Sequence, residues 1–275
     1  MNELLHSAIK AAINAGHDIL KIYDTNFKVE IKQDNTPVTM ADKAASKSII
    51  NSLSSFNIPF ICEEENIVNY ETRKNWQKLW LIDPLDGTKE FIKRNGEFTV
   101  NIALIEYDKP VIGVIYSPVF KNLFFALNGL GSFKINPHNV ISLINTNKLD
   151  CLKTILNSAQ QLPTVNKPKN YTVVASRSHL STELNSHIKQ LESKKGTINL
   201  INTGSSLKMC LVADGEANEY PRFGTTMEWD TAAGHCILNN ANGTIISTET
   251  NLPLTYNKQN LKNPNFIATQ INENI

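Results

Sequence analysis

Acidic residues follow or interrupt three apolar runs of this sequence. They lie in Phe60-Ile-Cys-Glu-Glu-Glu65, Trp80-Leu-Ile-Asp-Pro-Leu-Asp-Gly-Thr88 and Glu228-Trp-Asp-Thr-Ala-Ala-Gly234. Carboxylates that converge repel one another and resist ionisation unless cations neutralise them. Because these acids have no His or Cys partner, the oxygen-preferring ions Mg²⁺ and Mn²⁺ are favoured over Zn²⁺. Two such ions roughly 4 Å apart would polarise a phosphoryl group and activate water, so the pattern predicts phosphomonoester hydrolysis.

Each acidic segment also has an ordinary structural explanation. Residues 83–87 have the composition of a tight turn, in which Pro84 ends the preceding strand and which is too short to bury either acid in a core. Residues 63–65 suit a solvated loop. Asp230 suits the N-cap of a helix over 231–239. Taken one at a time, the segments leave these alternatives open.

The composition is that of a globular protein with little net charge. The chain has 275 residues, of which 41% are hydrophobic, enough to bury the core of one large domain or two packed lobes. Lys and Arg total 27 against 26 Asp and Glu, which leaves no charge footprint for a nucleic-acid partner. No run approaches the roughly 20 apolar residues of a membrane span. The four cysteines form no CxxC pair, which argues against a zinc knuckle or a disulfide framework and favours a reducing cytoplasm.

The hydrophobic period changes along the chain. Residues 1–23 show helical spacing and predict an amphipathic helix rather than a signal peptide. Residues 27–32 alternate as a short strand does, and Thr39 with Asp42 forms a variant capping box that begins a second helix. Short apolar runs separated by turns then predict a mostly antiparallel sheet, with strands at 59–62, 79–82, 98–105, 111–116 and 123–126.

The second half of the chain alternates between strands and helices. Residues 136–169 are polar and receive no assignment. The segments after them predict strands at 171–175, 198–202 and 244–247, and helices at 180–192, 206–213 and 229–239. We therefore predict an α/β fold, layered as in α+β proteins. An antiparallel-sheet lobe, residues 1–145, carries most of the metal ligands and forms one compact catalytic unit with a mixed, partly parallel lobe, residues 146–275.

Read together, the three acidic segments and Thr39-Met-Ala-Asp42 resemble the inositol monophosphatase superfamily of lithium-sensitive, magnesium-dependent phosphatases. Its signatures are an acid pair after a strand, D-P-[LI]-D-G-T and W-D-x-A-A-G. Residues 80–105, 176–179, 204–208 and 220–224 are similar to its bacterial CysQ branch, the 3'(2'),5'-bisphosphate nucleotidases. The resemblance covers nearly the whole chain except 136–169. It implies an αβαβα sandwich that removes the 3'-phosphate of 3'-phosphoadenosine 5'-phosphate, or of its phosphosulfate analogue, in sulfur metabolism and nucleotide recycling.

The resemblance also implies a ligand set for two or three Mg²⁺ ions per active site. Glu63, Asp83 and the Leu85 carbonyl would hold the first ion, and Asp83, Asp86 and Asp230 the second. Of the acidic run, Glu63 matches the first member of the family's acid pair and is assigned to catalysis as well as to metal binding.

A threonine and an aspartate complete the catalytic assignment that the resemblance implies. Thr88 and Asp42 would orient or deprotonate the water that attacks phosphorus in line. Each has a structural alternative, since Thr88 also suits a helix cap and Asp42 a first-turn helix acid.

The remaining candidates would bind the substrate. Backbone N–H groups at the start of a helix favour phosphate, and cationic side chains favour a second phosphate or the ribose. Lys208 and Arg222 suit ordinary surface charges equally well. Lys89, Lys93 and Arg94 would ring the entrance. The substrate-binding candidates are Gly87, Thr88, Ser178, His179, Ser205, Ser206, Lys208, Arg222 and Asp230.

Two other functions compete with this interpretation. An inositol 1-phosphate or fructose 1,6-bisphosphate phosphatase would share every metal ligand and differ around residues 176–224. A non-catalytic adenine-nucleotide sensor would keep the cluster as an anion receptor, although it would not need Thr88 and Asp42. We expect a cytoplasmic monomer or homodimer, with loose attachment to the inner face of the cell membrane as an alternative location.

Overall fold

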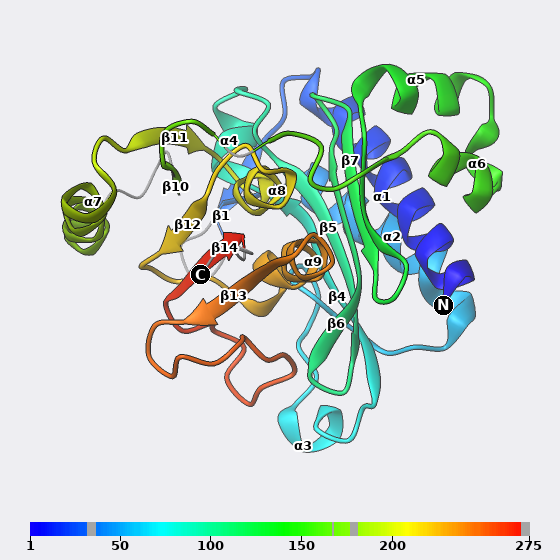
Figure 1. The fold of residues 1–275 in the computed structure, drawn as a ribbon. Coiled ribbons are helices and arrows are strands. Elements are labelled where there is room, and N and C mark those ends of the chain that lie inside the picture. The colour runs from blue at the N-terminus through cyan, green and yellow to red at the C-terminus, as the bar shows by residue number, and fades with distance from the viewer. Residues whose placement is uncertain (32–36, 167, 177–180, 271–275) are drawn as a thin grey trace.

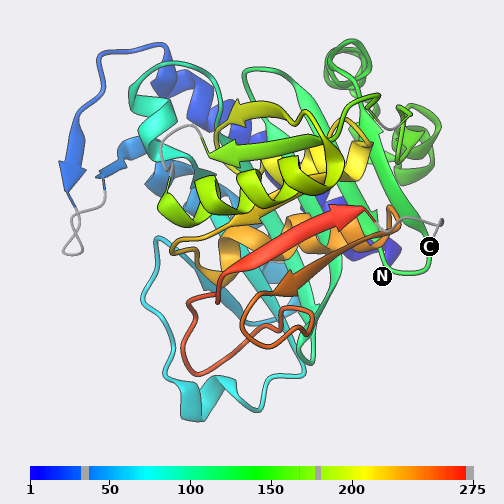
Figure 2. The same cartoon turned by 60° about the vertical axis from the view of Figure 1, so that its left-hand side comes forward.

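Five layers of helix and sheet make up the fold in the computed structural model, which describes residues 1–31, 37–166, 168–176 and 181–270 (Figure 1). Helices α1 (Asn2–Tyr23) and α2 (Met40–Leu53) cover one face of a large sheet. Helices α8 (Leu207–Asp214) and α9 (Glu228–Asn239) lie between its other face and a smaller sheet. Helix α7 (Thr182–Lys195) lies across the outer face of the smaller sheet, as Figure 2 shows. This order confirms the predicted αβαβα sandwich.

The large sheet has seven strands in the order β3-β4-β5-β6-β7-β8-β9. All neighbours are antiparallel except the parallel pair β3 and β4, which confirms the prediction of a mostly antiparallel sheet. Sequence analysis did not assign the last two strands. The bounds are β3 Phe60–Cys62, β4 Lys78–Asp86, β5 Thr99–Glu106, β6 Lys109–Ser117, β7 Asn122–Leu127, β8 Gly131–Ile135 and β9 Gln160–Gln161. Strand β9 joins this sheet from beyond residue 145. The division of the chain at residue 145 stays a prediction.

The smaller sheet has five strands in the order β11-β10-β12-β14-β13 and is mixed, as predicted. Strand β10 is parallel to β11 and β12, whereas β14 is antiparallel to β12 and β13. Strand β12 was not predicted, and it contains Pro221, which lacks a donor for the sheet. It pairs with β10 only at Glu219. The bounds are β10 Thr172–Ser176, β11 Asn199–Thr203, β12 Glu219–Arg222, β13 Gly243–Ser247 and β14 Phe266–Gln270.

Shorter elements connect the layers. The hairpin β1 (Val29–Ile31) and β2 (Pro37–Thr39) precedes α2, whose first turn contains the predicted capping box: the Thr39 N–H donates to Asp42 Oδ2 over 2.7 Å. Residues 136–169, unassigned from sequence, contain two short helices. The remaining helices are α3 Tyr70–Arg73, α4 Thr88–Ile92, α5 Pro137–Asn145 and α6 Leu152–Asn157, with 3₁₀ turns at Ser54–Phe56 and Lys148–Asp150.

Strand β4 contradicts the prediction that Pro84 ends it. The strand continues through Pro84 to Asp86, and its register against β5 shifts between Asp83 and Asp86. Such an irregularity accommodates a residue without an N–H donor inside a sheet. The expectation that both acids stay out of the core is also wrong for Asp83, whose exposure is 1%. The acids therefore lie on a bulged strand rather than in a surface turn.

Helix α9 packs unusually close to the large sheet. A Cβ atom added at Gly113 of β6 would lie 2.3 Å from the Ala233 carbonyl oxygen, so only glycine fits there. This contact fixes α9 over the sheet and places its first turn beside the end of β4. None of the described helices combines the length and apolarity needed to cross a bilayer.

Candidate active site

The register of two parallel strands brings Glu63 and Asp83 together. In that register Cys62 of β3 lies beside Ile82 of β4, and the Glu63 N–H donates to the Ile82 carbonyl over 3.2 Å. The next residue along each chain segment is an acid, so Glu63, directly after β3, lies beside Asp83 of β4.

Asp230 approaches these two acids from α9. Helix α9 begins at Glu228, so the alternative that Asp230 is its N-cap is wrong: Met227 is the N-cap, and Asp230 Oδ2 accepts a 2.7 Å hydrogen bond from the Met227 N–H. Ligand atoms of Glu63, Asp83 and Asp230 all lie within 4.8 Å of one another. Three of the predicted metal ligands, from three separate segments, thus converge.

Asp86 completes the acidic group from the end of β4. Its Oδ2 accepts hydrogen bonds from Ser206 Oγ at 2.7 Å and from Asn101 Nδ2 at 3.4 Å. Asn101 also donates to Ser206 over 2.7 Å. The Ser206 hydroxyl donates to Asp86 and Ser206 also lines the cavity, so its assignment to substrate binding stays a prediction.

Burial and the charges of neighbouring acids raise the pKa of two members of this group, Asp83 and Asp230. The pKa of Asp83 lies well above its usual value because the carboxyl is buried and because Glu63, Asp86, Asp230 and Asp42 surround it with negative charge. Burial, followed by the charges of Asp86 and Glu63, likewise raises the pKa of Asp230 well above its usual value. In the absence of a cation, the group is electrostatically unfavourable at neutral pH.

The donor set of this cluster fits a hard divalent cation. Among the described residues that line the surrounding cavity, the metal-binding side chains are Asp and Glu, with no His or Cys. Oxygen-only sites favour Mg²⁺ or Mn²⁺. The Leu85 carbonyl, the predicted main-chain ligand, lies 3.4 Å from Thr88 Oγ1 beside the same cavity.

Thr88 and Asp42 form a hydrogen-bonded pair next to the cluster. Thr88 Oγ1, in the first residue of α4, donates to Asp42 Oδ1 over 3.1 Å. Asp42 Oδ2 accepts from both the N–H and the hydroxyl of Thr39, each at 2.7 Å. Burial raises the pKa of Asp42 despite these hydrogen bonds. Asp42 therefore takes part in the capping box of α2 and also accepts a hydrogen bond from Thr88.

The acids line one part of a cavity of about 270 Å³, whose lining also includes cations and aromatic rings. Lys208 is buried, with Nζ 2.5 Å from the Ser205 carbonyl and 5.4 Å from the centre of the Tyr220 ring. Burial, with a contribution from the nearby charge of Arg222, lowers the pKa of Lys208 to about 8. Arg222 NH2 donates to the Thr225 carbonyl over 3.0 Å, while its buried Nε has no partner among the described residues. Two adjacent cations with unused donors are suited to binding an anion.

The other predicted substrate contacts are distributed unevenly. Gly87 and Ser205 line the cavity, both in the left-handed region, with φ of +98° and +49°. Helix α4, which Gly87 precedes, has only five residues, so its dipole is small. Ser178 and His179 lie outside the described residues. Lys89 lines the cavity, whereas the Arg94 guanidinium binds the Tyr23 and Thr25 carbonyls at the end of α1.

Several site residues were not found from sequence. Tyr220 and Phe266 contribute an edge-to-face aromatic pair to the cavity, with ring centres 5.7 Å apart. Asn101 was overlooked inside an apolar strand. A fully buried amide in such a run is a signal of a polar site nearby, because buried polar groups require partners.

Comparisons with known proteins agree with the fold and the site. The profile of the inositol monophosphatase family matches residues 1–275. The chain belongs to the inositol monophosphatase family. It is 44% identical over 238 residues to the 3'(2'),5'-bisphosphate nucleotidase CysQ of Salmonella typhimurium, covering 85% of this chain and 86% of the relative.

Two further relatives match over almost their whole length. The CysQ nucleotidase of Escherichia coli K12 is 40% identical over 268 residues, which is 96% of this chain and 98% of the relative. The crystal structure of CysQ from Bacteroides thetaiotaomicron superposes with a TM-score of 0.87 at 42% identity, covering 99% of each chain. The similarity therefore includes both sheets and every segment that contributes to the cavity.

The raised pKa of Asp83 predicts how stability without metal depends on pH. Unfolded Asp titrates near pH 4, so above that pH the native state keeps a proton that the unfolded state has lost, and stability falls as pH rises toward the folded pKa. In EDTA, the free energy of unfolding of the wild type should fall more steeply between pH 5 and pH 8 than that of Asp83→Asn, by about 1.4 kcal/mol per unit of pKa shift. Urea unfolding at several pH values measures both slopes.

His235 makes an opposing contribution to the pH dependence of stability. Comparing the slopes of wild type and Asp83→Asn cancels this contribution. Burial lowers the pKa of His235 to about 4, and a lowered folded-state pKa makes stability increase with pH between about 4 and 6.5. His235 packs against Tyr256, away from the acids, and contributes equally in both proteins. Equal slopes for wild type and variant would contradict the electrostatic account of Asp83.

Proposed function

We propose that this chain is a magnesium-dependent phosphomonoesterase that removes the 3'-phosphate of 3'-phosphoadenosine 5'-phosphate, or of the corresponding phosphosulfate. The products are phosphate and AMP, or adenosine 5'-phosphosulfate, which assigns the enzyme to sulfur metabolism and nucleotide recycling. The observation that carries the proposal is the convergence of Glu63, Asp83 and Asp230 within 4.8 Å in a cavity that also contains Lys208 and Arg222. The activity for which the CysQ relatives are named supports the same reaction.

The residues of the cluster have the chemistry to hold Mg²⁺. Glu63, Asp83 and the Leu85 carbonyl would form one site, and Asp83, Asp86 and Asp230 another. Bound Mg²⁺ supplies Lewis-acid polarisation of the phosphoryl group and lowers the pKa of water. The identity and number of the ions are part of the proposal.

Thr88 and Asp42 would orient or deprotonate the attacking water. The Thr88 hydroxyl donates its hydrogen bond to Asp42 Oδ1. The lone pairs of the hydroxyl oxygen therefore remain available to accept a hydrogen bond from water. Asp42 has a raised pKa, which makes it a better proton acceptor than an exposed carboxylate. A pure binding protein does not require this pair, which favours an enzyme over a nucleotide sensor.

Lys208 and Arg222 provide the argument for a substrate with two phosphates. The acids and their cations engage the phosphate that is cleaved, whereas the second phosphate requires a positive site of its own. Burial is the main cause of the lowered pKa of Lys208, the nearby positive charge of Arg222 lowers it further, and a bound anion would stabilise both cations. Inositol 1-phosphate, with one phosphate, leaves this pair without an anionic partner.

A phosphate-release panel tests the function. The purified protein should hydrolyse 3'-phosphoadenosine 5'-phosphate in the presence of Mg²⁺ and lose this activity in EDTA. The rate with inositol 1-phosphate should be lower by an order of magnitude or more, as expected when charge-assisted hydrogen bonds to a second phosphate, worth about 1.5–3 kcal/mol, are not made. Fructose 1,6-bisphosphate carries a second phosphate and serves as the comparison substrate without a nucleoside. Faster release from either of these two compounds would replace the proposed substrate, and release unaffected by EDTA would remove the metal from the mechanism.

Arg222→Ala tests the second phosphate site. The variant should raise KM for 3'-phosphoadenosine 5'-phosphate by roughly 10-fold to 100-fold, because a charge-assisted contact is lost. KM for adenosine 3'-monophosphate, which lacks the second phosphate, should change little. Arg94→Ala is the matched control, since that guanidinium binds carbonyls of the segment at the end of α1 instead. Equal changes in KM for both substrates would assign Arg222 a structural role.

The expected location and assembly stay predictions. A cytoplasmic protein, monomeric or homodimeric, is consistent with the substrate proposed. Cys62, Cys151, Cys210 and Cys236 are free thiols.

A further inference from the structure

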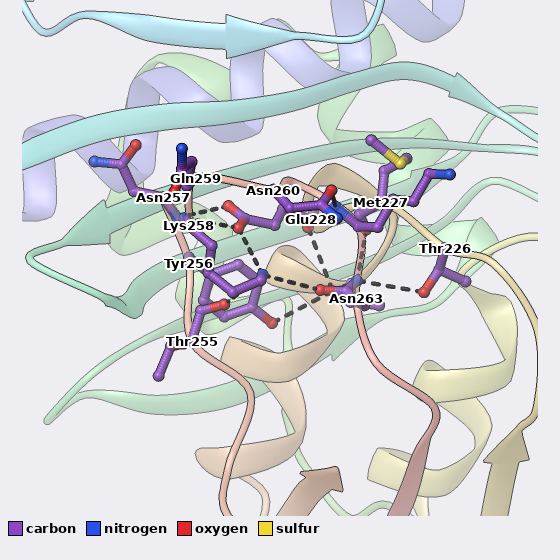
Figure 3. A network of polar contacts seen from close by, with 12 residues as sticks. Thr226, Met227, Glu228, Thr255, Tyr256, Asn257, Lys258, Gln259, Asn260 and Asn263 are labelled. Carbon is purple, nitrogen blue, oxygen red and sulfur yellow. Dashed lines mark hydrogen bonds and ion pairs between the residues drawn. The ribbon is translucent and has the colours of Figure 1, made fainter. Parts of the chain in front are cut away.

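The segment that precedes α9 is held by a second segment, residues 255–263, which we call the clamp loop (Figure 3). Backbone hydrogen bonds of 2.9 Å join the Glu228 N–H to the Leu261 carbonyl and the Asn263 N–H to the Thr226 carbonyl. Met227 and Lys262 face each other in an antiparallel bridge between them. The clamp loop therefore sets the position of residues 226–228.

Glu228 fastens the clamp loop with a buried carboxylate. Its side chain is fully buried and accepts the N–H of Asn257 at 2.6 Å and the N–H of Lys258 at 3.0 Å. Lys258 Nζ lies 2.6 Å from the same carboxylate, as Figure 3 shows. Removing one partner of such a pair leaves a buried charge without compensation, which is costly.

Asn263 connects the clamp loop to the turn that orients Asp230. Its Nδ2 donates to the Met227 carbonyl over 2.7 Å (Figure 3). The same nitrogen donates to Thr231 Oγ1 over 3.0 Å. The Met227 N–H in turn donates to Asp230 Oδ2 over 2.7 Å. A shift of Met227 would therefore rotate the Asp230 carboxylate away from Glu63 and Asp83.

The opposite end of the clamp loop reaches the segment that carries Glu63. Arg73, in α3 between β3 and β4, donates to Asn257 Oδ1 over 2.8 Å and to the Gln259 carbonyl over 3.0 Å. Asn257 Nδ2 returns a 2.8 Å bond to the Arg73 carbonyl. One loop thus connects the β3–β4 connection, which begins at Glu63, with the helix that supplies Asp230.

We propose that Glu228 is a positioning residue: through the clamp loop, it holds Met227 and so fixes the Asp230 carboxylate for metal binding. Glu228 acts on the ligand and not on the substrate. The proposal rests on the metal site of the proposed function. Groups that orient a metal ligand typically change metal affinity 10-fold to 100-fold when they are replaced.

Direct metal binding tests this proposal without relying on turnover. Mn²⁺ is titrated into the full-length protein and followed by electron paramagnetic resonance of free Mn²⁺, while thermal unfolding in EDTA reports stability. Glu228→Gln keeps the size of the side chain but replaces one acceptor oxygen with a donor. It should weaken the Mn²⁺ site to which Asp230 contributes by about 10-fold or more.

Asp214→Asn is the matched control. Asp214, at the end of α8, is also fully buried, pairs with Lys134 and accepts the N–H of Thr164 at 2.9 Å, but it holds a different loop. This control should lose stability and retain wild-type Mn²⁺ affinity. Should Glu228→Gln not fold, Asn263→Ala, which removes only the bonds of that side chain, should show the same weakening.

The outcomes separate the two proposals. If the wild type binds no Mn²⁺, the metal site of the proposed function fails. If the wild type binds Mn²⁺ and the folded Glu228 or Asn263 variant binds it equally well, or if Asp214→Asn weakens binding as much, the positioning role is overturned while the metal site stands.

Discussion

Repulsion among buried carboxylates is the constraint on which this structure depends. Glu63, Asp83 and Asp230 lie within 4.8 Å of one another, although like charges at that separation oppose both burial and ionisation. Each acid is fixed by a different part of the fold: a parallel strand pair, a bulged strand and the first turn of a tightly packed helix. Because these elements are stabilised by packing elsewhere, the acids cannot separate to relieve the repulsion. A divalent cation is the species that makes the arrangement favourable.

The same cavity separates charge of opposite sign. The carboxylates form a negative group in its lining, and Lys208 with Arg222 forms a positive group. The whole chain has a formal charge of only +1. Recognition of an anion therefore depends on local fields within a partly buried space, where electrostatic interactions are stronger than in water. This arrangement suits a substrate with two phosphates, of which one meets the metal ligands and the other meets fixed cations. The hydrogen bonds to Asp86 from Asn101, on the neighbouring strand β5, and from Ser206, at the start of α8, hold the acidic side in place.

Local sequence signals predicted the elements whose determinants lie within one segment. The capping box at Thr39, the helical period of residues 1–23 and the acids at strand ends all follow from neighbours in the chain. Pro84 misled the interpretation, since a proline usually ends a strand, whereas here a bulge accommodates it. Contacts between distant segments, such as that of Glu228 with Lys258, have no signature in local spacing. The burial of Asp83 was missed for the same reason, because α9 and the second sheet cover it from another part of the chain.

Anomalous scattering from crystals grown with Mn²⁺ tests the central claim most directly, since it locates the ion without reference to activity. The account predicts a strong peak bounded by Glu63, Asp83 and Asp230, with the Asp83 carboxylate within about 2.0–2.5 Å of it, the usual range for hard cations and oxygen ligands. Crystals at millimolar Mn²⁺ with no peak among these side chains would contradict it, as would side chains that turn away from one another in an ion-free cavity.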